Sequence, residues 1–361
     1  MLMRIFYAAD SSPNPGFSSN LWRNNLHDSL VELGHDVVEF RYDLHETFSH
    51  LDPARPDDLK FIDNNRPALS AELLRQIRAA HAEQPVTLFF SYFYNACVLP
   101  ETLDEIRSLG ILTVNWYCNA SYQFHLVREI SPHYDWCLVP EKFRLKDYEA
   151  IGARPLYCQE AANPNIYRPF DLPREFEVTF IGQAYGERPD YVRHLRGCGI
   201  DIRVWGANWE YHVQPVSRNP FRRWFQKVPG GIPAHAAGGI LGDREMIELY
   251  SRSKINLGFS SCGDTHLGEN RILQVRLRDF EVPMSGGFYL TEYQPELEEF
   301  FEIDREIVCY RTRDELVDKI RFYLKHETAR EKIRISGLER SLRDHTWQKR
   351  FRDAFAVMGI A

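Results

Sequence analysis

Three arginines and one glutamate occupy a short segment of the sequence. Arg271, Arg276 and Arg278 lie within eight residues, and Glu281 follows three residues after the last of them. Guanidinium groups donate paired hydrogen bonds and suit a diphosphate. A carboxylate beside such arginines can accept two hydrogen bonds from a ribose diol. The segment therefore indicates a nucleotide site, although an ordinary amphipathic helix with solvated arginines fits the same spacing.

Small residues end this segment. Ser285 precedes the pair Gly286 and Gly287, and an apolar run follows them. Because a glycine has no Cβ, its backbone can approach a ligand closely. We expect this pair to contact the ligand of the arginine segment.

Several familiar catalytic motifs are absent from the sequence. There is no GxxxxGK[ST] loop, no HExxH and no DxD, and the first turn after a strand has one glycine, Gly16, where a dinucleotide fingerprint needs GxGxxG. These absences exclude a P-loop ATPase, a zincin and an ordinary NAD dehydrogenase. They also exclude a DxD clamp that would hold a metal ion and a nucleotide.

The elements that must position these residues alternate between apolar strand-like runs and helical runs. This alternation predicts parallel, doubly wound sheets with helices on both faces. We expect strands at 3–9, 36–40, 86–90, 111–116, 136–139, 178–182, 201–206, 253–259, 288–291 and 306–310. We expect helices at 21–33, 71–82, 101–109, 143–151, 189–197, 244–251 and 314–326, and a final helical region at 328–357.

The length of 361 residues suits two domains of about 150 to 200 residues each. A Pro/Asn-rich stretch at 161–170 separates two rounds of alternation, because its prolines disfavour a continuous helix or a central strand. The fold class is therefore α/β, with two Rossmann-like domains in tandem and a cleft between them. We expect the domains at 1–160 and 171–343.

The net charge and the hydropathy of the chain argue against two kinds of partner, nucleic acid and the membrane interior. The net charge of -7 argues against a protein that binds nucleic acid through phosphate contacts. No run approaches the length of a membrane span, and the first ten residues lack a secretory signal. We therefore expect a cytoplasmic protein with no nucleic-acid partner and no integral membrane segment.

The stretch 219–242 fits neither the strand pattern nor the helix pattern. It contains Phe221-Arg-Arg-Trp-Phe225 and then five glycines. We interpret it as a mobile loop near the cleft, while a plain surface insertion and a membrane-contacting patch remain alternatives.

The arginine segment resembles the donor-site signature of the CgeB-like (spore maturation protein) glycosyltransferases of the GT-B superfamily. That signature reads Arg/Lys-x-Arg-x-Phe-Glu-x-Pro-x-x-Gly-Gly. This chain supplies Arg276, Arg278, Phe280, Glu281, Pro283, Gly286 and Gly287. The resemblance covers about residues 155–355, and the first half is similar only to a generic GT-B acceptor domain.

This resemblance implies a transfer of a sugar from a nucleotide-sugar donor to the hydroxyl group of an unknown glycan, lipid or protein acceptor. It implies no cofactor and no metal ion, because arginines take the place of magnesium at the diphosphate. It also implies that a C-terminal helix, 344–361, returns to the N-terminal domain. The donor-binding residues are then Gly182, Gly206, Arg271, Arg276, Arg278, Glu281, Ser285, Gly286 and Gly287.

The catalytic residues implied are Arg276 for the leaving diphosphate and Asp10 or His125 for the acceptor hydroxyl. The sequence departs from related retaining families, in which a Glu-x7-Glu pair lies in this segment. Glu281 occupies the second position of the pair, but Leu273 occupies the first. Contacts to the sugar must then come from other residues, and the stereochemistry is open.

Two other functions stay open at this point. One is a nucleotide-sugar 2-epimerase, which has a similar two-lobed fold and would release a changed sugar nucleotide without an acceptor. The other is a catalytically silent sugar-binding or assembly protein, which would bind the nucleotide without hydrolysing the donor. The set of Arg276, Arg278 and Glu281 favours an active enzyme.

Overall fold

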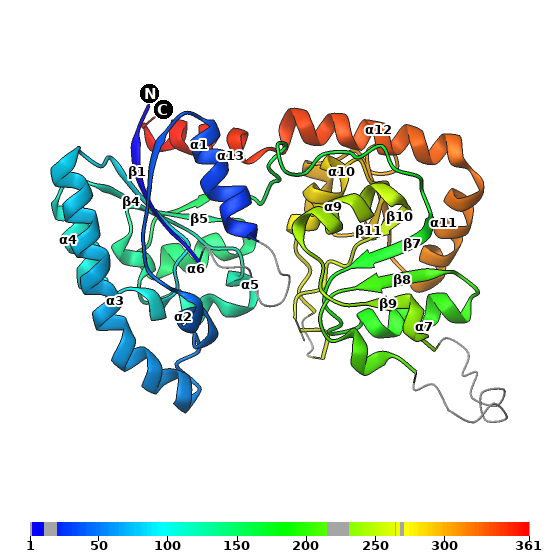
Figure 1. Ribbon diagram of the computed structural model, residues 1–361, viewed down its shortest axis with the longest axis horizontal. Helices are drawn as coiled ribbons and strands as arrows, with labels where there is room; N and C mark the ends of the chain where they lie inside the picture. The colour runs from blue at the N-terminus through cyan, green and yellow to red at the C-terminus, as the bar shows by residue number, and fades with distance from the viewer. Residues whose placement is uncertain (1, 11–19, 215–230, 264, 268–270, 361) are drawn as a thin grey trace. The chain divides into compact units, whose positions relative to one another are not determined.

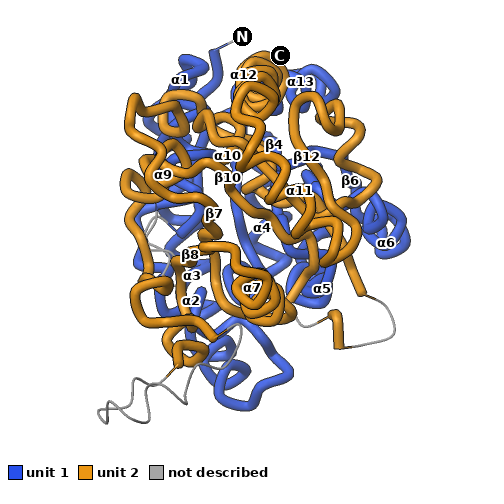
Figure 2. Tube along the Cα trace, turned by 90° about the vertical axis from the view of Figure 1, so that its right-hand side faces the viewer, with its two compact units in different colours: residues 1–12, 20–160, 347–361 blue, residues 13–19, 161–346 orange. Residues whose placement is uncertain are grey.

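The computed structural model describes residues 2–10, 20–214, 231–263, 265–267 and 271–360 (Figure 1). These residues form two compact units, shown in different colours in Figure 2. Unit 1 holds the described residues up to 160 together with those after 346, and unit 2 holds those from 161 to 346. Each unit contains one six-stranded sheet. The expected Rossmann-like repeat is therefore confirmed.

The sheet of unit 1 is parallel and has the order β2-β1-β3-β4-β5-β6. Its strands are β1 (Arg4–Ala8), β2 (Asp36–Glu39), β3 (Leu88–Ser91), β4 (Leu112–Trp116), β5 (Trp136–Val139) and β6 (Pro155–Tyr157). Every residue of β3 and β5 is buried. This burial explains their continuous apolar sequence, since helices cover both faces of a parallel sheet.

The helices of unit 1 are α1 (Asp28–Glu32), α2 (His45–Ser49), α3 (Pro56–Glu83), α4 (Pro100–Ser108), α5 (Ala120–Gln123), α6 (Leu145–Ala150) and α13 (Trp347–Met358). α3 packs beside α4, and α1 packs beside α13. A proline in the first turn starts both α3 and α4, where its missing N–H group costs nothing. The predicted helix at 71–82 is too short, because α3 begins at Pro56 and continues through Pro67.

Helix α13 completes the core of unit 1 although it follows unit 2 in the sequence. The ring of Trp347 lies 5.1 Å from that of Trp116, and the ring of Phe351 lies 5.6 Å from that of Phe90. Trp347 and Phe351 have no exposed surface. The residues after 346 thus bury aromatic side chains against strands β3 and β4.

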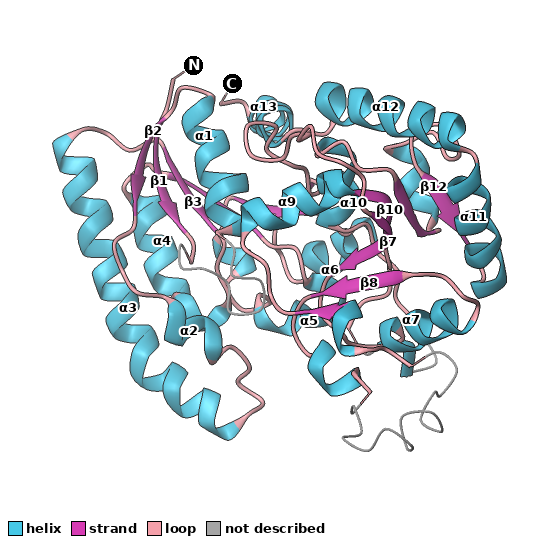
Figure 3. Ribbon diagram, turned by 45° about the vertical axis from the view of Figure 1, so that its right-hand side comes forward, coloured by secondary structure: helices cyan, strands magenta, loops and turns pink. Residues whose placement is uncertain are grey.

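The sheet of unit 2 is also parallel and has the order β12-β11-β10-β7-β8-β9 (Figure 3). Its strands are β7 (Phe176–Ile181), β8 (Ile202–Trp205), β9 (Ala237–Gly238), β10 (Ser253–Leu257), β11 (Tyr289–Glu292) and β12 (Val308–Tyr310). Its helices are α7 (Arg188–Gly197), α9 (Asp243–Arg252), α10 (Leu277–Met284), α11 (Arg313–Lys325) and α12 (Glu327–Asp344). α10 packs against α12, and α12 packs against α11. The single helical region predicted at 328–357 is thus two helices, α12 and α13.

The segment 219–242 is only partly described, because residues 215–230 lie outside the described residues. In the remaining part, Ile232 is buried and forms a bridge with Val213, and β9 pairs with β8 at the edge of the sheet. The interpretation of the whole stretch as a loop or an insertion is therefore wrong for β9. None of the helices in the described ranges is long and apolar enough to cross a membrane.

Candidate functional site

The arginine segment lies where the strand order of the second sheet reverses. β8 follows β7 in the sequence and lies on one side of it, whereas β10 lies on the other side. Ligands of open parallel sheets bind beyond the carboxyl ends of the strands at such a point. The chain leaves these ends at 182–187 after β7 and at 258–263 after β10. The residues of both loops are therefore the first candidates for contact with a ligand.

Arg188 is the buried basic residue at the start of α7, directly after the first loop. Its Nη1 donates to the carbonyl oxygen of Gln183 at 3.1 Å, and its Nη2 donates to the Tyr185 hydroxyl at 2.7 Å. The guanidinium carbon lies 3.8 Å from the centre of the Tyr185 ring. Only 6% of Arg188 is exposed. Burial lowers the pKa of Arg188 to about 9, and the charges of Arg276 and Arg278 act in the same direction.

Arg276 stands at the start of α10. Its backbone N–H donates to Oδ2 of the buried Asp279 at 2.7 Å, an arrangement that caps the helix. Its side chain donates to the carbonyl oxygen of Ser261 and, at 3.4 Å, to the Tyr185 hydroxyl. Arg276 and Arg188 therefore share one hydroxyl group. Burial raises the pKa of Asp279 to about 6.

Arg278 lies in the first turn of α10, close to the end of β7. Its guanidinium carbon is 5.5 Å from the centre of the Phe180 ring. Burial opposes its charge, but the Tyr250 hydroxyl and the Glu281 carboxylate outweigh burial, so that the pKa of Arg278 is raised. A Cβ on Gly182 would lie 3.3 Å from Nη2 of Arg278. It would also lie 2.7 Å from Cζ of Phe180, so the glycine leaves room for the Phe180 ring and for this guanidinium group at the end of β7.

The charge of this cluster is incompletely balanced. Arg188 is surrounded by a carbonyl oxygen and a hydroxyl group and pairs with no carboxylate among the described residues. A buried charge without a counter-charge is costly. Two further guanidinium groups lie close enough to lower its pKa. The arrangement can therefore accept an anion with several negative charges.

Glu281 supplies a buried carboxylate on α10, one turn after Arg278. It is 4% exposed, and burial raises its pKa to about 7, against the charge of Arg278 and a hydrogen bond from Tyr167. Its Oε1 atom is buried and accepts no hydrogen bond from any described residue. A ligand hydroxyl group could occupy this acceptor, as the sequence analysis predicts for a ribose.

Arg271 is engaged by two carboxylates. Its Nη2 and Nε lie 2.7 and 2.8 Å from Oε2 of Glu187, and its Nη1 lies 2.7 Å from Oε1 of Glu292. The positive charge of Arg271 is therefore already balanced by two carboxylates and is not available to bind a diphosphate. The predicted contact between Arg271 and the donor stays a prediction.

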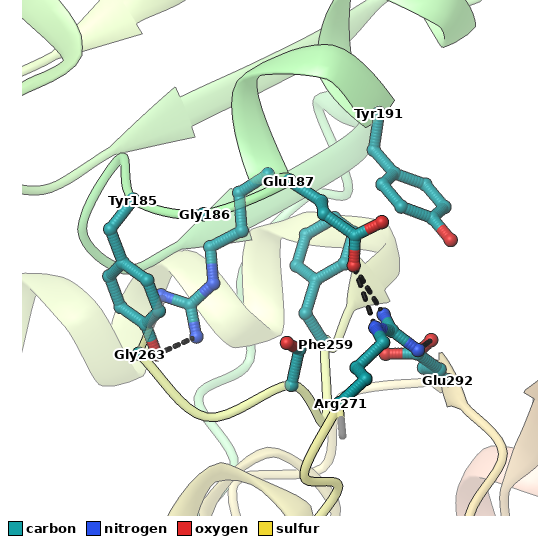
Figure 4. Close-up of a pocket in the computed structure, with 10 residues that line it drawn as sticks. Tyr185, Gly186, Glu187, Tyr191, Phe259, Gly263, Arg271 and Glu292 are labelled. Atoms are coloured by element: carbon teal, nitrogen blue, oxygen red, sulfur yellow. Dashed lines mark hydrogen bonds and ion pairs between the residues drawn. The ribbon is translucent and has the colours of Figure 1, made fainter. Parts of the chain in front are cut away.

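A small, partly open pocket lies beside the arginine cluster (Figure 4). It is lined by Tyr185, Gly186, Glu187, Arg188, Tyr191, Phe259, Ser261, Gly263, Arg271 and Glu292. The residues come from the loops after β7 and β10, from α7 and from the end of β11. The pocket therefore joins the carboxyl ends of three strands of one sheet.

Gly182 and Gly206 end neighbouring strands, as the sequence predicts. A Cβ on Gly206 would lie 2.4 Å from the carbonyl oxygen of Gly182, and Gly206 has a φ of +137°. The carbonyl oxygen of Gly182 also accepts a hydrogen bond from the Trp209 indole at 2.7 Å. Contact between two chain segments thus accounts for the glycine at position 206, without a ligand.

Ser285, Gly286 and Gly287 lie at the opposite end of α10 from Arg276; Ser285, the nearest of them, is about 14 Å away at 1.5 Å per residue. Gly286 has a φ of +70°, and Gly287 N–H donates to the carbonyl oxygen of Val282 at 2.9 Å. These features belong to a helix end in the left-handed conformation. The structure does not bring the three residues together with Arg276.

The predicted acceptor-side residues belong to unit 1. Asp10 follows β1 and is half-buried. His125 is exposed, and its Nε2 lies 3.6 Å from Oδ1 of Asp52. Their roles stay predictions, and the turn 11–19 that follows Asp10 lies outside the described residues.

Sequence reasoning missed Arg188 and Tyr185. A signal for Arg188 was present, because Pro189 favours the first turn of a helix and so places Arg188 at the start of α7. An arginine at the start of the helix after the first strand of a Rossmann-like unit faces the ligand edge of the sheet. No pattern in the sequence marks the Tyr185 hydroxyl as the shared partner of two arginines.

Comparison with known proteins adds two findings. Residues 188–356 match a family described as glycosyl transferase-like. None of the curated proteins matches the chain at a significant level. The family match covers the second sheet except for β7 and ends within α13.

Several solved structures share the fold along nearly the whole chain. Sucrose-phosphate synthase from Thermosynechococcus elongatus is 12% identical with a TM-score of 0.63, over 98% of this chain and 100% of that one. Anabaena HepE in complex with UDP-glucose is 11% identical with a TM-score of 0.58, over 99% and 100%. A putative UDP-N-acetylglucosamine 2-epimerase from Listeria monocytogenes is 10% identical with a TM-score of 0.53, over 100% and 96%. The chain therefore has the GT-B fold of two Rossmann-like domains.

Proposed function

We propose that this protein is a glycosyltransferase that moves a sugar from a nucleotide-sugar donor to the hydroxyl group of an acceptor, without a bound metal ion. The glycosyl transferase-like match and the GT-B fold support the class of enzyme. The resemblance of the α10 segment to the CgeB-like enzymes supports the narrower assignment.

One observation carries the proposal. The Tyr185 hydroxyl accepts hydrogen bonds from both Arg188 and Arg276 at the ligand edge of the second sheet, and Arg188 has no carboxylate partner among the described residues. A diphosphate group supplies the missing negative charge. Guanidinium groups bind it through paired hydrogen bonds.

In the proposed reaction, negative charge develops on the leaving nucleoside diphosphate. The bond between C1 of the sugar and the phosphate oxygen breaks, and its electron pair stays on the nucleoside diphosphate. Arg188, Arg276 and the N-terminal end of α10 stabilise this negative charge. The acceptor oxygen forms the new bond to C1 and gives up its proton to a base, for which Asp10 and His125 are the candidates.

Glu281 has a different role in this proposal. Its Oε1 atom, which no described residue contacts by a hydrogen bond, accepts hydrogen bonds from the ribose hydroxyl groups. Tyr167 donates to the same carboxylate and limits its rotation. Glu281 therefore contributes to donor affinity and takes no part in the bond that breaks.

The partners follow from the same site. UDP-glucose, which is present in the HepE complex, is the first donor to test. The acceptor is a glycan, a lipid or a protein. The net charge of -7 supports the absence of a nucleic-acid partner, and we place the protein in the cytoplasm.

A binding experiment tests the donor site. Titration calorimetry with UDP, GDP and ADP, each alone and as the glucose or mannose conjugate, identifies the nucleotide. Arg188→Gln should then weaken binding of that nucleotide by about 30-fold, because a charged hydrogen-bonding group is lost. Arg193→Gln is the control, since Arg193 lies on the same helix and pairs with Asp190 at the surface. Equal affinities for both variants, or no binding of any nucleotide, would contradict the proposal.

A turnover experiment tests the reaction. Hydrolysis of the best donor, with water as acceptor, should release nucleoside diphosphate at the same rate within about twofold in EDTA and in magnesium. Loss of the reaction in EDTA and its recovery with magnesium would show that the arginines do not replace a metal ion. A changed sugar nucleotide as the product would indicate an epimerase, and binding without turnover would indicate a silent sugar-binding protein.

A further inference from the structure

The Tyr185 side chain contacts the charged groups of two arginines at once. Its hydroxyl accepts hydrogen bonds from Nη2 of Arg188 at 2.7 Å and from Nη2 of Arg276 at 3.4 Å. Its ring lies against the Arg188 guanidinium, whose carbon is 3.8 Å from the ring centre. A tyrosine hydroxyl is a neutral acceptor, so it fills hydrogen-bonding positions without supplying negative charge. Tyr185 therefore stands where an anion would balance both guanidinium groups.

The space around the Arg188 guanidinium is already filled. Its Nη1 donates to the carbonyl oxygen of Gln183 at 3.1 Å, and its Nη2 donates to the Tyr185 hydroxyl (Figure 4). The pocket beside it has room for about one water molecule, which is far less than a diphosphate needs. A phosphate oxygen that reaches Nη2 must therefore take the position of the Tyr185 hydroxyl.

The tyrosine is the member of this group that is able to move. Arg188 is 6% exposed, and Ala184, the residue before Tyr185, is buried and donates its N–H to the carbonyl oxygen of Ala207 at 2.9 Å. Tyr185 is only half-buried. Rotation about its Cα–Cβ bond carries the hydroxyl to another staggered position while the backbone stays in place. The exchange of Tyr185 for a ligand thus needs one side-chain rotation and no change in the fold.

We propose that the Tyr185 side chain occupies the diphosphate position in the free protein and rotates out of it when the donor binds. The inference rests on the proposed function, which places the donor diphosphate at Arg188 and Arg276. In the exchange, phosphate oxygens replace one hydroxyl oxygen on both guanidinium groups. An ionised acceptor binds a guanidinium more strongly than a neutral one, so the exchange is favourable.

Tyr185 is then a competitor of the donor for the same two arginines. The hydrogen bonds that it makes in the free protein must break before the diphosphate binds, and this requirement lowers the measured affinity. The alternative role for Tyr185 is a fixed partner that holds both guanidinium groups in place for the donor. The two roles predict opposite changes in affinity when the hydroxyl is removed.

Calorimetry on the Tyr185→Phe variant measures the sign of this change. Phenylalanine keeps the ring that lies against Arg188 and lacks the hydroxyl. The nucleoside diphosphate that binds best among UDP, GDP and ADP should bind at least about threefold more tightly to Tyr185→Phe than to the wild-type protein. Tyr211→Phe is the matched control, because Tyr211 is 79% exposed, and its affinity should equal that of the wild type within about twofold. Equal or weaker binding by Tyr185→Phe would overturn the inference.

Fluorine NMR tests the movement itself in the wild-type protein. In protein labelled with 3-fluorotyrosine, the resonance of Tyr185 is the one that a folded Tyr185 variant lacks, and Tyr185→Leu identifies it if Tyr185→Phe does not fold. The difference in chemical shift between H2O and D2O reports the exposure of the fluorine to solvent. On saturation with the nucleoside diphosphate, this difference should rise for Tyr185 towards the value of Tyr211. A difference that stays at its ligand-free value would show that the side chain does not leave the arginines.

Failure of the inference and failure of the proposed function give different results. If no nucleoside diphosphate binds, the donor site itself is wrong and the role of Tyr185 is wrong with it. If one binds and Arg188→Gln weakens that binding, but removal of the Tyr185 hydroxyl does not tighten it, only the role of Tyr185 is wrong.

Discussion

The two ends of α10 differ in what their polar groups contact. At the start of the helix, Arg276 and Arg278 face loops of the sheet, and the Nε atom of Arg278 is buried with no hydrogen-bond partner among the described residues. At the end of the helix, the backbone of Gly286 and Gly287 makes hydrogen bonds within the chain, and the neighbours of both glycines leave no room for a Cβ.

This difference shows that one run of twelve residues, 276–287, has two separate roles. Charged groups held at a buried position without sufficient counter-charges indicate a ligand. Glycines whose missing Cβ is explained by Pro169, Asn256 or Val282 indicate a packing requirement. Variants at the start of α10 should therefore change chemistry and preserve folding, whereas variants at its end should change folding and preserve chemistry per folded molecule.

The largest effect is expected at Arg276. Arg276→Ala removes positive charge where the leaving diphosphate gains negative charge, so turnover at saturating donor should fall by about two to three orders of magnitude. Rates of donor hydrolysis at several donor concentrations measure this loss. The control is Arg305→Ala, an exposed arginine of the same unit. If the Arg276→Ala variant folds and has normal turnover, Arg276 does not take part in the reaction and the two ends of α10 do not differ in role.

The next effect is expected at Glu281. Glu281→Gln keeps the size of the side chain but removes the charge that strengthens hydrogen bonds to the ribose, so donor affinity should fall by about 1.5 to 3 kcal/mol. Turnover at saturating donor should fall less. Calorimetry with the donor measures the affinity, and Glu298→Gln at the surface is the control. Normal donor affinity in the Glu281→Gln variant would show that Glu281 does not bind the ribose.

The end of α10 should respond in stability. A Cβ at position 287 would lie 2.7 Å from Nδ2 of Asn256 and 2.8 Å from Cγ1 of Val282, so Gly287→Ala should destabilise unit 2 by about 1 to 3 kcal/mol. Thermal or urea unfolding measures the change. Gly239→Ala is the matched control, because a Cβ there meets no atom within 4 Å. Gly287→Ala with normal stability but weak donor binding would place the glycine at the ligand.

The smallest effect is a dependence on pH. Burial raises the pKa of Glu281 to about 7, and only the ionised form accepts both ribose hydrogen bonds, so donor affinity should fall up to about tenfold from pH 8 to pH 6. UDP-glucose is a suitable probe because its diphosphate does not titrate in this range. The dependence should disappear in Glu281→Gln, and a dependence that persists would belong to another group.

The same carboxyl predicts the opposite trend for the unliganded protein. Because the pKa is higher in the folded state than in the unfolded state, the folded state holds the proton more tightly. The stability that this group contributes is complete below about pH 4.5 and is lost as the pH rises through about 7. Urea unfolding without ligand at pH 5 and pH 8 measures this trend.

Much of the fold could be predicted from periodicity. The strands at 136–139 and 36–40 are found within one residue, because apolar β-branched and aromatic runs between turn signals define them. β9 could not be predicted, since two residues in a glycine-rich stretch carry no period and pair only through β8. The start of α3 was missed because its first turns at 56–70 are largely polar.

The site could be predicted only where a motif marks it. Arg276, Arg278 and Glu281 were proposed from their spacing and from the resemblance to the CgeB-like signature, and the structure places all three on or beside α10. Arg188 joins them through the fold alone, because the strand order brings the start of α7 to the start of α10. Arg271 is the opposite case. Its charge looks available for a ligand in the sequence, but in the structure two carboxylates that are distant in sequence, Glu187 and Glu292, pair with it.

The position of helix α13 limits when unit 1 can fold during synthesis. Unit 1 buries Trp347 and Phe351 against β3 and β4, so its core is incomplete until residues beyond 346 have been synthesised. The described residues of unit 2 all lie between 161 and 346, and this range contains all six strands of its sheet. During translation, domains generally fold as units in the order in which they emerge. Here the core of unit 1 cannot be completed before the strands of unit 2 have been synthesised, because α13 follows them in the sequence.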